Sequence, residues 1–341
     1  MRFLVVGAGF AGCTIARILA EHGFSVDIID QRPHIGGNAY DFTNEHGIRI
    51  HKYGPHYFHT NNKEVFEWLS RFTKWTKHEQ KVLALLKDGT YVPFPVNTTT
   101  LKKIPKEKVF ETFFEPYSRK MWGQYYDELD KSVFDRVKTK NDSDDRYYSN
   151  EKYQFIPTFG YEMLFQNMLK LSTIRVFLEK KFEKQMEKNY DHIFNSMAID
   201  EYYDYCYGKL PYRSIKFDVC DVKIPKVLPT TNVNFTYGPY TRVTEWKNIP
   251  DHGINDKITT LTFETPCDPE DVGGEKYYPV LTEKNRELYK KYKNIPNDKV
   301  TFIGRCGLYT YLDMHQVISS SLSTAKNFLE KIYGNRRKIA A

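Results

Sequence analysis

The stretch RFLVVGAGFAG, residues 2–12, decides the fold of this 341-residue chain. An apolar strand runs into Gly7-x-Gly9-x-x-Gly12, in which each glycine has a physical task. Gly7 permits a tight turn, Gly9 lets the backbone approach a pyrophosphate, and Gly12 lets the following helix lie close to the sheet. The stretch therefore predicts a dinucleotide-binding unit, with a purely structural glycine-rich turn as the weaker alternative.

The elements that follow support the same prediction. We expect a helix from Gly12 to about His22 whose N-terminus points at the phosphates, because free N–H groups and the helix dipole favour negative charge there. A second apolar run ends at Asp30, at the right distance to accept hydrogen bonds from a ribose. Beyond it, the pair Gly36-Gly37 lets the backbone pass close to a bulky cofactor. Many flavoproteins carry such a loop, although an ordinary loop would explain the same pair.

The C-terminal part of the chain gives independent support for a flavin. Residues 300–305, VTFIGR, are typical of a buried strand that ends in a cation, Arg305. Asp313 is expected to cap a helix from Met314 to about Ile332. A second helix N-terminus and a cation are therefore available to the cofactor, which makes FAD the preferred dinucleotide over a simple nicotinamide.

The composition limits the classes of function. Fifty Lys and Arg against 43 Asp and Glu give a charge of +7, and no concentrated basic stripe suggests a nucleic-acid partner. No run approaches the roughly 20 apolar residues of a membrane helix, and the apolar start carries the nucleotide turn rather than a signal peptide. Five scattered cysteines without a CxxC pair indicate reduced thiols and a cytoplasmic setting. The 26 tyrosines suit a site that stacks a base or binds sugars, although a tyrosine-rich surface is an equal explanation.

The predicted organisation is an α/β fold with a discontinuous cofactor domain. Strands near 175–178 and 192–195 would return the chain to the glycine-rich unit, and β-rich runs over 212–265 indicate an antiparallel sheet. Residues 131–150 are polar with few apolar anchors, so we expect a mobile loop. The expected domains are an FAD-binding domain (1–75, about 172–208 and 290–341), a helical and mobile-loop substrate domain (76–145), and an antiparallel sheet domain (146–171 and 209–289). The other expected elements are helices at 63–72, 106–130 and 161–171, and a hairpin at 80–96 that turns at 87–89.

The densest group of histidines lies in HKYGPHYFH, residues 51–59. A metal site is disfavoured, because no carboxylate or cysteine sits at ligand spacing beside these histidines, and no metal is expected. One interpretation places this loop against a flavin ring, with His56 or its backbone tuning the cofactor. The other is a polar loop whose imidazoles have ordinary hydrogen-bond partners.

Four cations are candidates for binding phosphate. No Ser/His/Asp set and no pair of carboxylates marks a catalytic centre, so the cofactor must carry the chemistry. Fixed, forked arginines suit phosphate recognition. Arg213 and Arg242 lie at the edges of predicted strands, whereas Arg136 and Lys140 lie in the polar loop. On spacing alone, each of these is more often a surface cation than a ligand.

Taken together, these segments resemble the UDP-galactopyranose mutases, flavoenzymes that interconvert UDP-galactopyranose and UDP-galactofuranose. The resemblance covers nearly the whole chain in order. The matching stretches are HIGGNAY (34–40), HKYGPHYFHT (51–60), Tyr117 with Trp122-Gly123, Tyr153-Gln154 with Ile156-Pro157, YRS (212–214), NFT (234–236), PYTR (239–242), YYPV (277–280) and DMHQVI (313–318).

The resemblance implies a Rossmann-like FAD-binding domain with a shortened helical insertion and an antiparallel β-sheet domain. It also implies a non-redox reaction, in which N5 of reduced FAD attacks the anomeric carbon of the sugar and UDP leaves. The ring then opens and recloses through a different hydroxyl group. NAD(P)H or dithionite would reduce the flavin. The partner would be a UDP-sugar, and the enzyme a dimer or a monomer, since residues 97–122 are fewer than in the bacterial family.

The resemblance further implies roles for individual residues. Arg242 would be one half of a clamp on the substrate diphosphate, and Lys140, with Arg136 one turn before it, the other half. Two departures are Gly54-Pro55-His56 in place of Gly-Ala-His, and Lys140 where relatives carry a second arginine. The predicted catalytic residues are Arg242, His56, Arg213, Arg305 and Lys140. The predicted cofactor-binding residues are Gly7, Gly9, Phe10, Ala11, Gly12, Asp30, Gln31, Gly37, Asn38, His56, Arg305, Asp313 and Met314. The predicted substrate-binding residues are Tyr117, Trp122, Arg136, Lys140, Tyr153, Asn234, Arg242, Tyr278 and Tyr311.

Three alternatives remain open. The first is the same ring contraction on another nucleotide sugar, such as UDP-N-acetylgalactosamine or a dTDP-6-deoxyhexose. The second is a flavin amine oxidase or desaturase, which shares the N-terminal unit but would consume oxygen. The third is a flavin-containing sugar-nucleotide binding protein without turnover.

Overall fold

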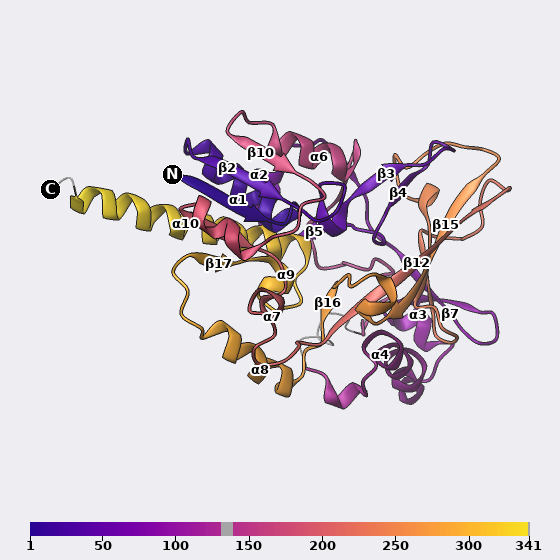
Figure 1. The fold of residues 1–341 in the computed structure, drawn as a ribbon. Helices are drawn as coiled ribbons and strands as arrows, with labels where there is room; N and C mark the ends of the chain where they lie inside the picture. The colour runs from indigo at the N-terminus through magenta and orange to yellow at the C-terminus, as the bar shows by residue number, and fades with distance from the viewer. Residues whose placement is uncertain (131–138, 340–341) are drawn as a thin grey trace.

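The computed structural model describes residues 1–130 and 139–339 and confirms the expected α/β class (Figure 1). Within those residues the strands form four sheets. A parallel sheet has the order β10 (Ile174–Phe177), β2 (Ser25–Ile29), β1 (Arg2–Val6), β11 (His192–Asn195) and β17 (Val300–Phe302). A mixed sheet has the order β16 (Tyr278–Pro279), β12 (Tyr212–Val222), β15 (Thr259–Cys267), β14 (Arg242–Glu245), β13 (Asn232–Phe235), β7 (Val82–Leu85) and β8 (Tyr91–Phe94). The small antiparallel sheets are β3 (Asp41–Thr43) with β4 (Arg49–His51), and β5 (Phe58–Thr60), β9 (Tyr153–Pro157) and β6 (Trp75–Lys77).

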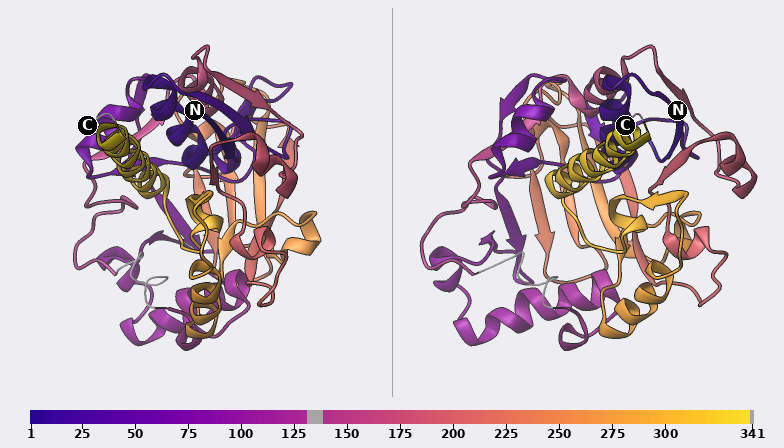
Figure 2. Two further views of the ribbon diagram at one scale, coloured as in Figure 1. Left: turned by 60° about the vertical axis from the view of Figure 1, so that its left-hand side comes forward. Right: turned by 90° about the vertical axis from the view of Figure 1, so that its left-hand side faces the viewer.

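The helices cover the sheets on several sides (Figures 1 and 2). They are α1 (Phe10–Glu21), α2 (Lys63–Leu69), α3 (Thr98–Leu101), α4 (Glu115–Trp122), α6 (Gly160–Leu169), α7 (Ile199–Tyr202), α8 (Glu283–Lys293), α9 (Gly304–Gly307) and α10 (Met314–Ile339). The C-terminal part of α10 projects from the body of the molecule, as the yellow helix in Figure 1 shows.

The parallel sheet combines three distant parts of the chain. The strands predicted near 175–178 and 192–195 are β10 and β11, and they pair in parallel with β2 and β1. Helices α1 and α10 pack together, and the side chains of Phe3, Phe194 and Phe328 meet edge to face between sheet and helix. The sheet is therefore complete only when segments from the two ends of the chain have met.

The close approach of α1 to β1 depends on Gly12. A Cβ atom on Gly12 would lie 1.9 Å from the carbonyl oxygen of Gly7 and 2.8 Å from the Cγ1 of Val5. Gly7 has φ +101°, a value that L side chains rarely adopt. Both positions agree with the roles predicted for the glycine-rich turn. The N-cap residue of α1, Gly9, has no side chain to accept the first N–H groups of the helix, which are therefore available to a ligand.

The mixed sheet differs in one respect from the antiparallel sheet expected from the sequence. The predicted hairpin forms as β7 and β8, but β7 pairs in parallel with β13, with Val82 opposite Asn232 and Leu85 opposite Phe235. The hairpin was expected to belong to the helical insertion. Its apolar alternation instead completes the edge of the sheet that carries Arg242, because Val82 and Ala84 are buried.

Helix α6 was expected to belong with the antiparallel sheet, yet it packs against α1. Its residues Tyr161, Leu164, Phe165 and Met168 are fully buried in the core that α1 shares with the parallel sheet. The packing follows from four apolar side chains at helical spacing. The division of the chain into three domains stays a prediction, and α6 lies on the cofactor side of it.

The helical prediction for residues 106–130 is confirmed as far as Trp122 and is wrong beyond it. Pro105 and Pro116 lack backbone N–H groups, and the chain forms a short 3₁₀ turn and a π-helical stretch (Phe110–Phe114) before α4. Helix α4 then ends at Gly123, whose φ of +63° is the left-handed conformation of a C-terminal cap. Across the described residues, no helix is both long and apolar enough to cross a membrane.

Candidate active site

Two cavities meet where the parallel sheet faces the mixed sheet. The smaller, of about 360 Å³, follows the glycine-rich turn, and we call it the cofactor cavity. The larger, of about 480 Å³, lies between the mixed sheet and α4, and we call it the substrate cavity. His56, Arg305 and Met314 line both cavities. Because these three residues are shared, groups bound in the two cavities would touch at this junction.

Most of the predicted cofactor-binding residues line the cofactor cavity. They are Gly7, Gly9, Phe10, Ala11, Asp30, Gln31, Gly37, Asn38, His56, Arg305 and Met314. Two do not. Gly12 does not face the cavity; it allows α1 to pack closely on β1, which positions the residues that do. Asp313 lines the substrate cavity instead, because α10 begins only at Met314 and the residue before it turns to the other side of the junction.

The shape of this cavity fits a dinucleotide. A Cβ atom on Gly37 would lie 2.9 Å from the Cα of Gly9, so the backbone of the two loops forms a cradle that side chains would fill. Asp30 closes one end, with Oδ2 accepting the N–H of Ala8 at 2.8 Å and Oδ1 that of Arg32 at 2.9 Å. Each carboxylate oxygen keeps a lone pair for a ribose hydroxyl.

Of the cations that line this cavity, the sequence predicted only Arg305. It missed Arg32, Lys180, Lys181 and Lys276. Arg32 forms an ion pair with Glu275, and its guanidinium lies 4.3 Å from the ring centroid of Tyr53. The sequence does place Arg32 two residues after Asp30, in the loop that follows the second predicted strand, and this position could have suggested a cofactor contact. No local pattern connects it to Glu275, 243 residues away.

Arg242 lies in the wall of the substrate cavity, where the sequence predicted a phosphate ligand. Its Nε and Nη2 atoms donate to the two carboxylate oxygens of Glu264 at 2.9 and 2.8 Å. Burial alone would lower the pKa of Arg242, but the ion pair with Glu264 raises it. Glu264 is 2 % exposed, so a buried carboxylate fixes the guanidinium plane from behind. The cation is therefore rigid, as diphosphate binding requires.

Aromatic rings form another wall of the substrate cavity. Tyr278 and Tyr311 are stacked with centroids 5.2 Å apart, and Trp122 meets each edge to face at 6.1 Å. The guanidinium of Arg305 lies 4.9 Å from the centroid of Tyr278 and 5.0 Å from that of Tyr311. Burial raises the pKa of Tyr278 to about 12, so its hydroxyl is a hydrogen-bond donor at neutral pH. Tyr117 and Asn234 line the same cavity, as predicted.

His56 is neutral at the junction. Burial lowers its pKa to about 4, and its Nδ1 lies 2.8 Å from the carbonyl oxygen of Gly54, which fixes the ring. Nδ1 therefore carries the proton, and Nε2 is the acceptor. The hydroxyl of Tyr161 donates to the backbone carbonyl of His56 at 3.1 Å. The loop is held by its neighbours, which favours the interpretation of a fixed cofactor-side loop.

Buried imidazoles make stability depend on pH. Burial lowers the pKa of His56, His192 and His252 to about 4, and that of His51 well below its usual value. Between about pH 4 and 6.5 the unfolded chain binds more protons at these sites, so stability is expected to fall as the pH falls through that window. Urea unfolding at pH 7 and pH 5 measures the effect. His252→Asn should show a smaller difference between the two values, and an unchanged wild-type midpoint would contradict the prediction.

Arg213 lines neither cavity in this structure, and its predicted role at the flavin or the substrate stays a prediction. Its Nε donates to the carbonyl oxygen of Met121 at 2.9 Å, and its Nη1 pairs with Asp268. The residue lies on β12 opposite the C-terminal end of α4. Carbonyl groups at a helix C-terminus attract cations, which explains where the guanidinium lies.

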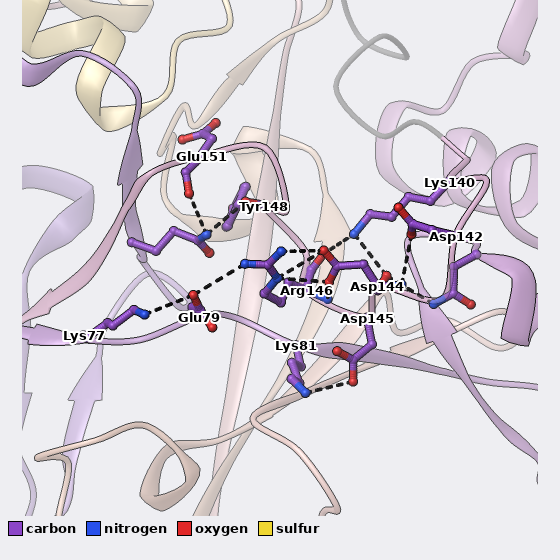
Figure 3. A network of polar contacts seen from close by, with 12 residues as sticks. Lys77, Glu79, Lys81, Lys140, Asp142, Asp144, Asp145, Arg146, Tyr148 and Glu151 are labelled. Carbon is purple, nitrogen blue, oxygen red and sulfur yellow. Dashed lines mark hydrogen bonds and ion pairs between the residues drawn. The ribbon is translucent and has the colours of Figure 1, made fainter.

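Lys140 is also not brought to the substrate cavity, and Arg136 lies outside the described residues. The ammonium of Lys140 donates to the carbonyl oxygens of Asp144, at 3.3 Å, and Arg146 (Figure 3). Arg146 forks onto the carboxylate of Asp144, and Lys81 pairs with Asp145 at 2.9 Å. Residues 139–150 thus have polar anchors where apolar ones are few, and the mobility of the loop stays a prediction. The role of Lys140 as a diphosphate ligand stays a prediction.

Tyr153 faces away from the substrate cavity. It lies on β9, and its ring stacks on Phe66 of α2 with centroids 4.3 Å apart. Side chains alternate along a strand, so this register turns Tyr153 toward the helix. Tyr147 and Tyr148, which precede β9, line the cavity instead. Their position could have been read only from the pairing of β9, which the sequence did not reveal.

A group of titratable side chains on one side of the substrate cavity was also missed. His59 Nδ1 lies 2.8 Å from a carboxylate oxygen of Glu151, and its ring stacks on Tyr148 at 3.6 Å. His59, Asp313 and His315 place ligand atoms within 4.8 Å of one another. Sequence spacing found no carboxylate near the histidines, because both carboxylates come from distant segments.

The fold and the two joined cavities define a nucleotide-binding protein with a Rossmann-like domain and a cationic, aromatic-lined ligand cavity. A model of the UDP-galactopyranose mutase family matches residues 112–311, and a model of NAD(P)-binding Rossmann-like domains matches residues 5–72. The chain is 33% identical to the dTDP-fucopyranose mutase of Escherichia coli, over 96% of this chain and 98% of that protein. It is 30% identical to a probable UDP-galactopyranose mutase of Klebsiella pneumoniae, over 96% and 95% of the two chains.

A solved structure agrees with these similarities. The crystal structure of reduced UDP-galactopyranose mutase superposes with a TM-score of 0.77 at 16% identity, covering 96% of this chain and 95% of that chain. At this identity the likeness supports the fold. The family model and the full-length relatives decide the rest: the chain belongs to the UDP-galactopyranose mutase family, and it is an enzyme of that family.

Proposed function

We propose that this enzyme interconverts UDP-galactopyranose and UDP-galactofuranose, with FAD in the cofactor cavity and the nucleotide sugar in the substrate cavity. The observation that carries the proposal is the junction formed by His56, Arg305 and Met314. A flavin ring at the end of the cofactor cavity would there face a sugar whose diphosphate reaches Arg242. A dehydrogenase that carries hydride between separate substrates would not need a rigid cation and an aromatic wall around one sugar nucleotide.

The residues of the cofactor cavity suit FAD. The cradle of Gly9 and Gly37 and the N-terminus of α1 would hold the pyrophosphate, and Asp30 the ribose. FAD bound there and reduced by NAD(P)H or dithionite would supply a nucleophilic nitrogen for the anomeric carbon of the sugar. His56 is neutral and fixed, so it adds no positive charge beside the cofactor. Arg305 supplies that charge at the junction, held by the carbonyl oxygens of Leu312 at 2.7 Å and Tyr277 at 3.0 Å.

The residues of the substrate cavity suit a departing diphosphate. Glu264 occupies Nε and Nη2 of Arg242, which leaves Nη1 to donate to phosphate oxygens. Charge developing on the leaving UDP would be stabilised by this fixed cation and by the donor hydroxyl of Tyr278. Trp122 and Tyr117 would pack against the sugar and the base. By the family resemblance, a loop cation, Arg136 or Lys140, would complete the clamp.

The decisive experiment assays the dithionite-reduced protein with UDP-galactofuranose and separates the products by chromatography. We expect UDP-galactopyranose to form over many turnovers per enzyme molecule, without consumption of oxygen. The same protein kept oxidised in air is the matched control and should give no product. Oxygen uptake with stoichiometric substrate oxidation would support an oxidase and overturn the proposal.

A second substrate has one specific observation in its favour. The relative named dTDP-fucopyranose mutase is at least as similar to this chain as the probable UDP-galactopyranose mutase, at 33% against 30% identity. A dTDP-6-deoxyhexose would use the same diphosphate and flavin contacts. Competition between UDP and dTDP for the reduced protein, followed by turnover of each sugar nucleotide, distinguishes the two.

A further inference from the structure

Two cations fasten α4 to the mixed sheet. On one side, Arg213 of β12 donates from Nε to the carbonyl oxygen of Met121 at 2.9 Å and from Nη2 to that of Lys120 at 3.4 Å. On the other side, the ammonium of Lys120 donates to the carbonyl oxygens of Phe235 at 2.7 Å and Tyr240 at 2.8 Å. Neither cation lines the cofactor cavity or the substrate cavity, so each acts on the position of the helix and not on a ligand directly.

The two anchors lead to different walls of the substrate cavity. Arg213 lies directly opposite Tyr278 in the pairing of β12 with β16. Tyr240 lies just before Arg242 in the connection between β13 and β14. Helix α4 itself contributes Tyr117, Ser118 and other side chains to the cavity. The helix is thus tied to the strand beside the aromatic wall and to the turn before the phosphate-binding cation.

We propose that Arg213 and Lys120 are positioning residues that set the distance between α4 and the Arg242 side of the substrate cavity, and so its selectivity for the nucleotide. A hydrogen bond from a charged donor to a backbone carbonyl is among the stronger polar contacts in a protein, and a partly buried one resists exchange with water. The exposed fraction of the Arg213 side chain is only 15 %. Burial lowers the pKa of Lys120 to about 8, in agreement with an ammonium enclosed by protein.

This positioning role rests on the proposed function, because the affinity of the cavity for a nucleotide is the quantity that reports its width. Arg213→Met and Lys120→Met are expected to raise KM for the nucleotide sugar and Kd for UDP by about 5- to 20-fold each, the loss of one or two hydrogen bonds from a charged group. The value of kcat should change by less than about 3-fold, since no group that touches the reacting atoms is removed. The ratio of UDP to dTDP affinity should move toward one as the wall loosens.

Matched controls separate positioning from charge. Asp268→Asn removes the negative charge of the exposed partner of Arg213, a side chain that is 65 % exposed, and leaves the contacts of Arg213 with α4, so it should leave KM unchanged. Arg119→Met removes an exposed cation of the same helix, paired with Glu115 and stacked on Tyr125, and should also be silent. Arg213→Lys can reach one carbonyl but not both, so it should recover part of the lost affinity.

The double variant supplies a further readout. If both cations hold the same helix, the second substitution should cost less than the first, and the effects on Kd should fall short of additivity. Flavin content and thermal unfolding report whether a variant folds, and if Arg213→Met does not fold, Lys120→Met tests the proposal alone. Equal loss of kcat with unchanged KM, strict additivity, or an Asp268→Asn effect as large as Arg213→Met would overturn it. Wild-type protein that binds no UDP would instead reject the proposed function.

Discussion

Arg242→Met is expected to weaken UDP binding by about 2–3 kcal/mol, roughly 30- to 150-fold in Kd, because a charged, forked donor to phosphate is lost. The same change should lower thermal stability, since Glu264 would remain buried without its partner. Isothermal titration with UDP and a thermal unfolding scan measure the two effects on one protein.

A double variant separates binding from folding. Arg242→Met with Glu264→Gln removes the charge that would be left buried, so stability should recover while UDP affinity stays low. Arg175→Met is the matched control, because Arg175 forks onto Asp27 with the same two distances, 2.8 and 2.9 Å, on β10, away from both cavities. UDP affinity equal to wild type in Arg242→Met would remove this residue from the site.

Gly12→Ala is expected to cost more than about 3 kcal/mol of stability or to prevent folding, since the new methyl group would lie 1.9 Å from a backbone oxygen that cannot move without β1. The loss should include the cofactor, because α1 carries the N–H groups of the cradle. Denaturant unfolding and the ratio of bound flavin to protein are the measurements.

Gly334→Ala is the matched control, a glycine to alanine change in another helix, where an added Cβ meets nothing within 4 Å. It should stabilise the protein by about 0.5–1 kcal/mol, the helix propensity difference between the two residues. If Gly12→Ala were as stable as wild type, the close packing of α1 on β1 would be wrong. Opposite signs at the two positions would show that the cost at Gly12 is steric.

The parts of this molecule that were predictable from the sequence are those that local chemistry decides. The glycine-rich turn, the acid at the end of β2 and the start of α10 follow from residues within one or two turns of each other. The end of α4 was equally local, since Gly123 marks it, and the expectation of a helix as far as residue 130 overlooked this glycine. The stacked pair of Tyr278 and Tyr311 came only through the family resemblance.

The parts that were not predictable depend on contacts between distant segments. The guanidinium of Arg213 could bind phosphate. Only the packing of α4 beside β12 shows that it donates instead to a carbonyl group at the C-terminal end of the helix. The carboxylate of Glu151 reaches His59 across 92 residues. The parallel pairing of β7 with β13 joins strands from opposite halves of the chain. The chemistry of a side chain limits the contacts that a residue can make, and tertiary packing decides which of those contacts it makes.

The order of strands in the parallel sheet has a consequence for biosynthesis. β1 is synthesised first, yet its neighbour β11 follows only after more than half of the chain, and the edge strand β17 comes close to the end. The glycine-rich turn therefore leaves the ribosome long before the strands and the helix that bury it. Nascent chains stalled before β17 should be open to proteases and unable to retain the flavin, so we expect the cofactor to bind only after β17 has been synthesised.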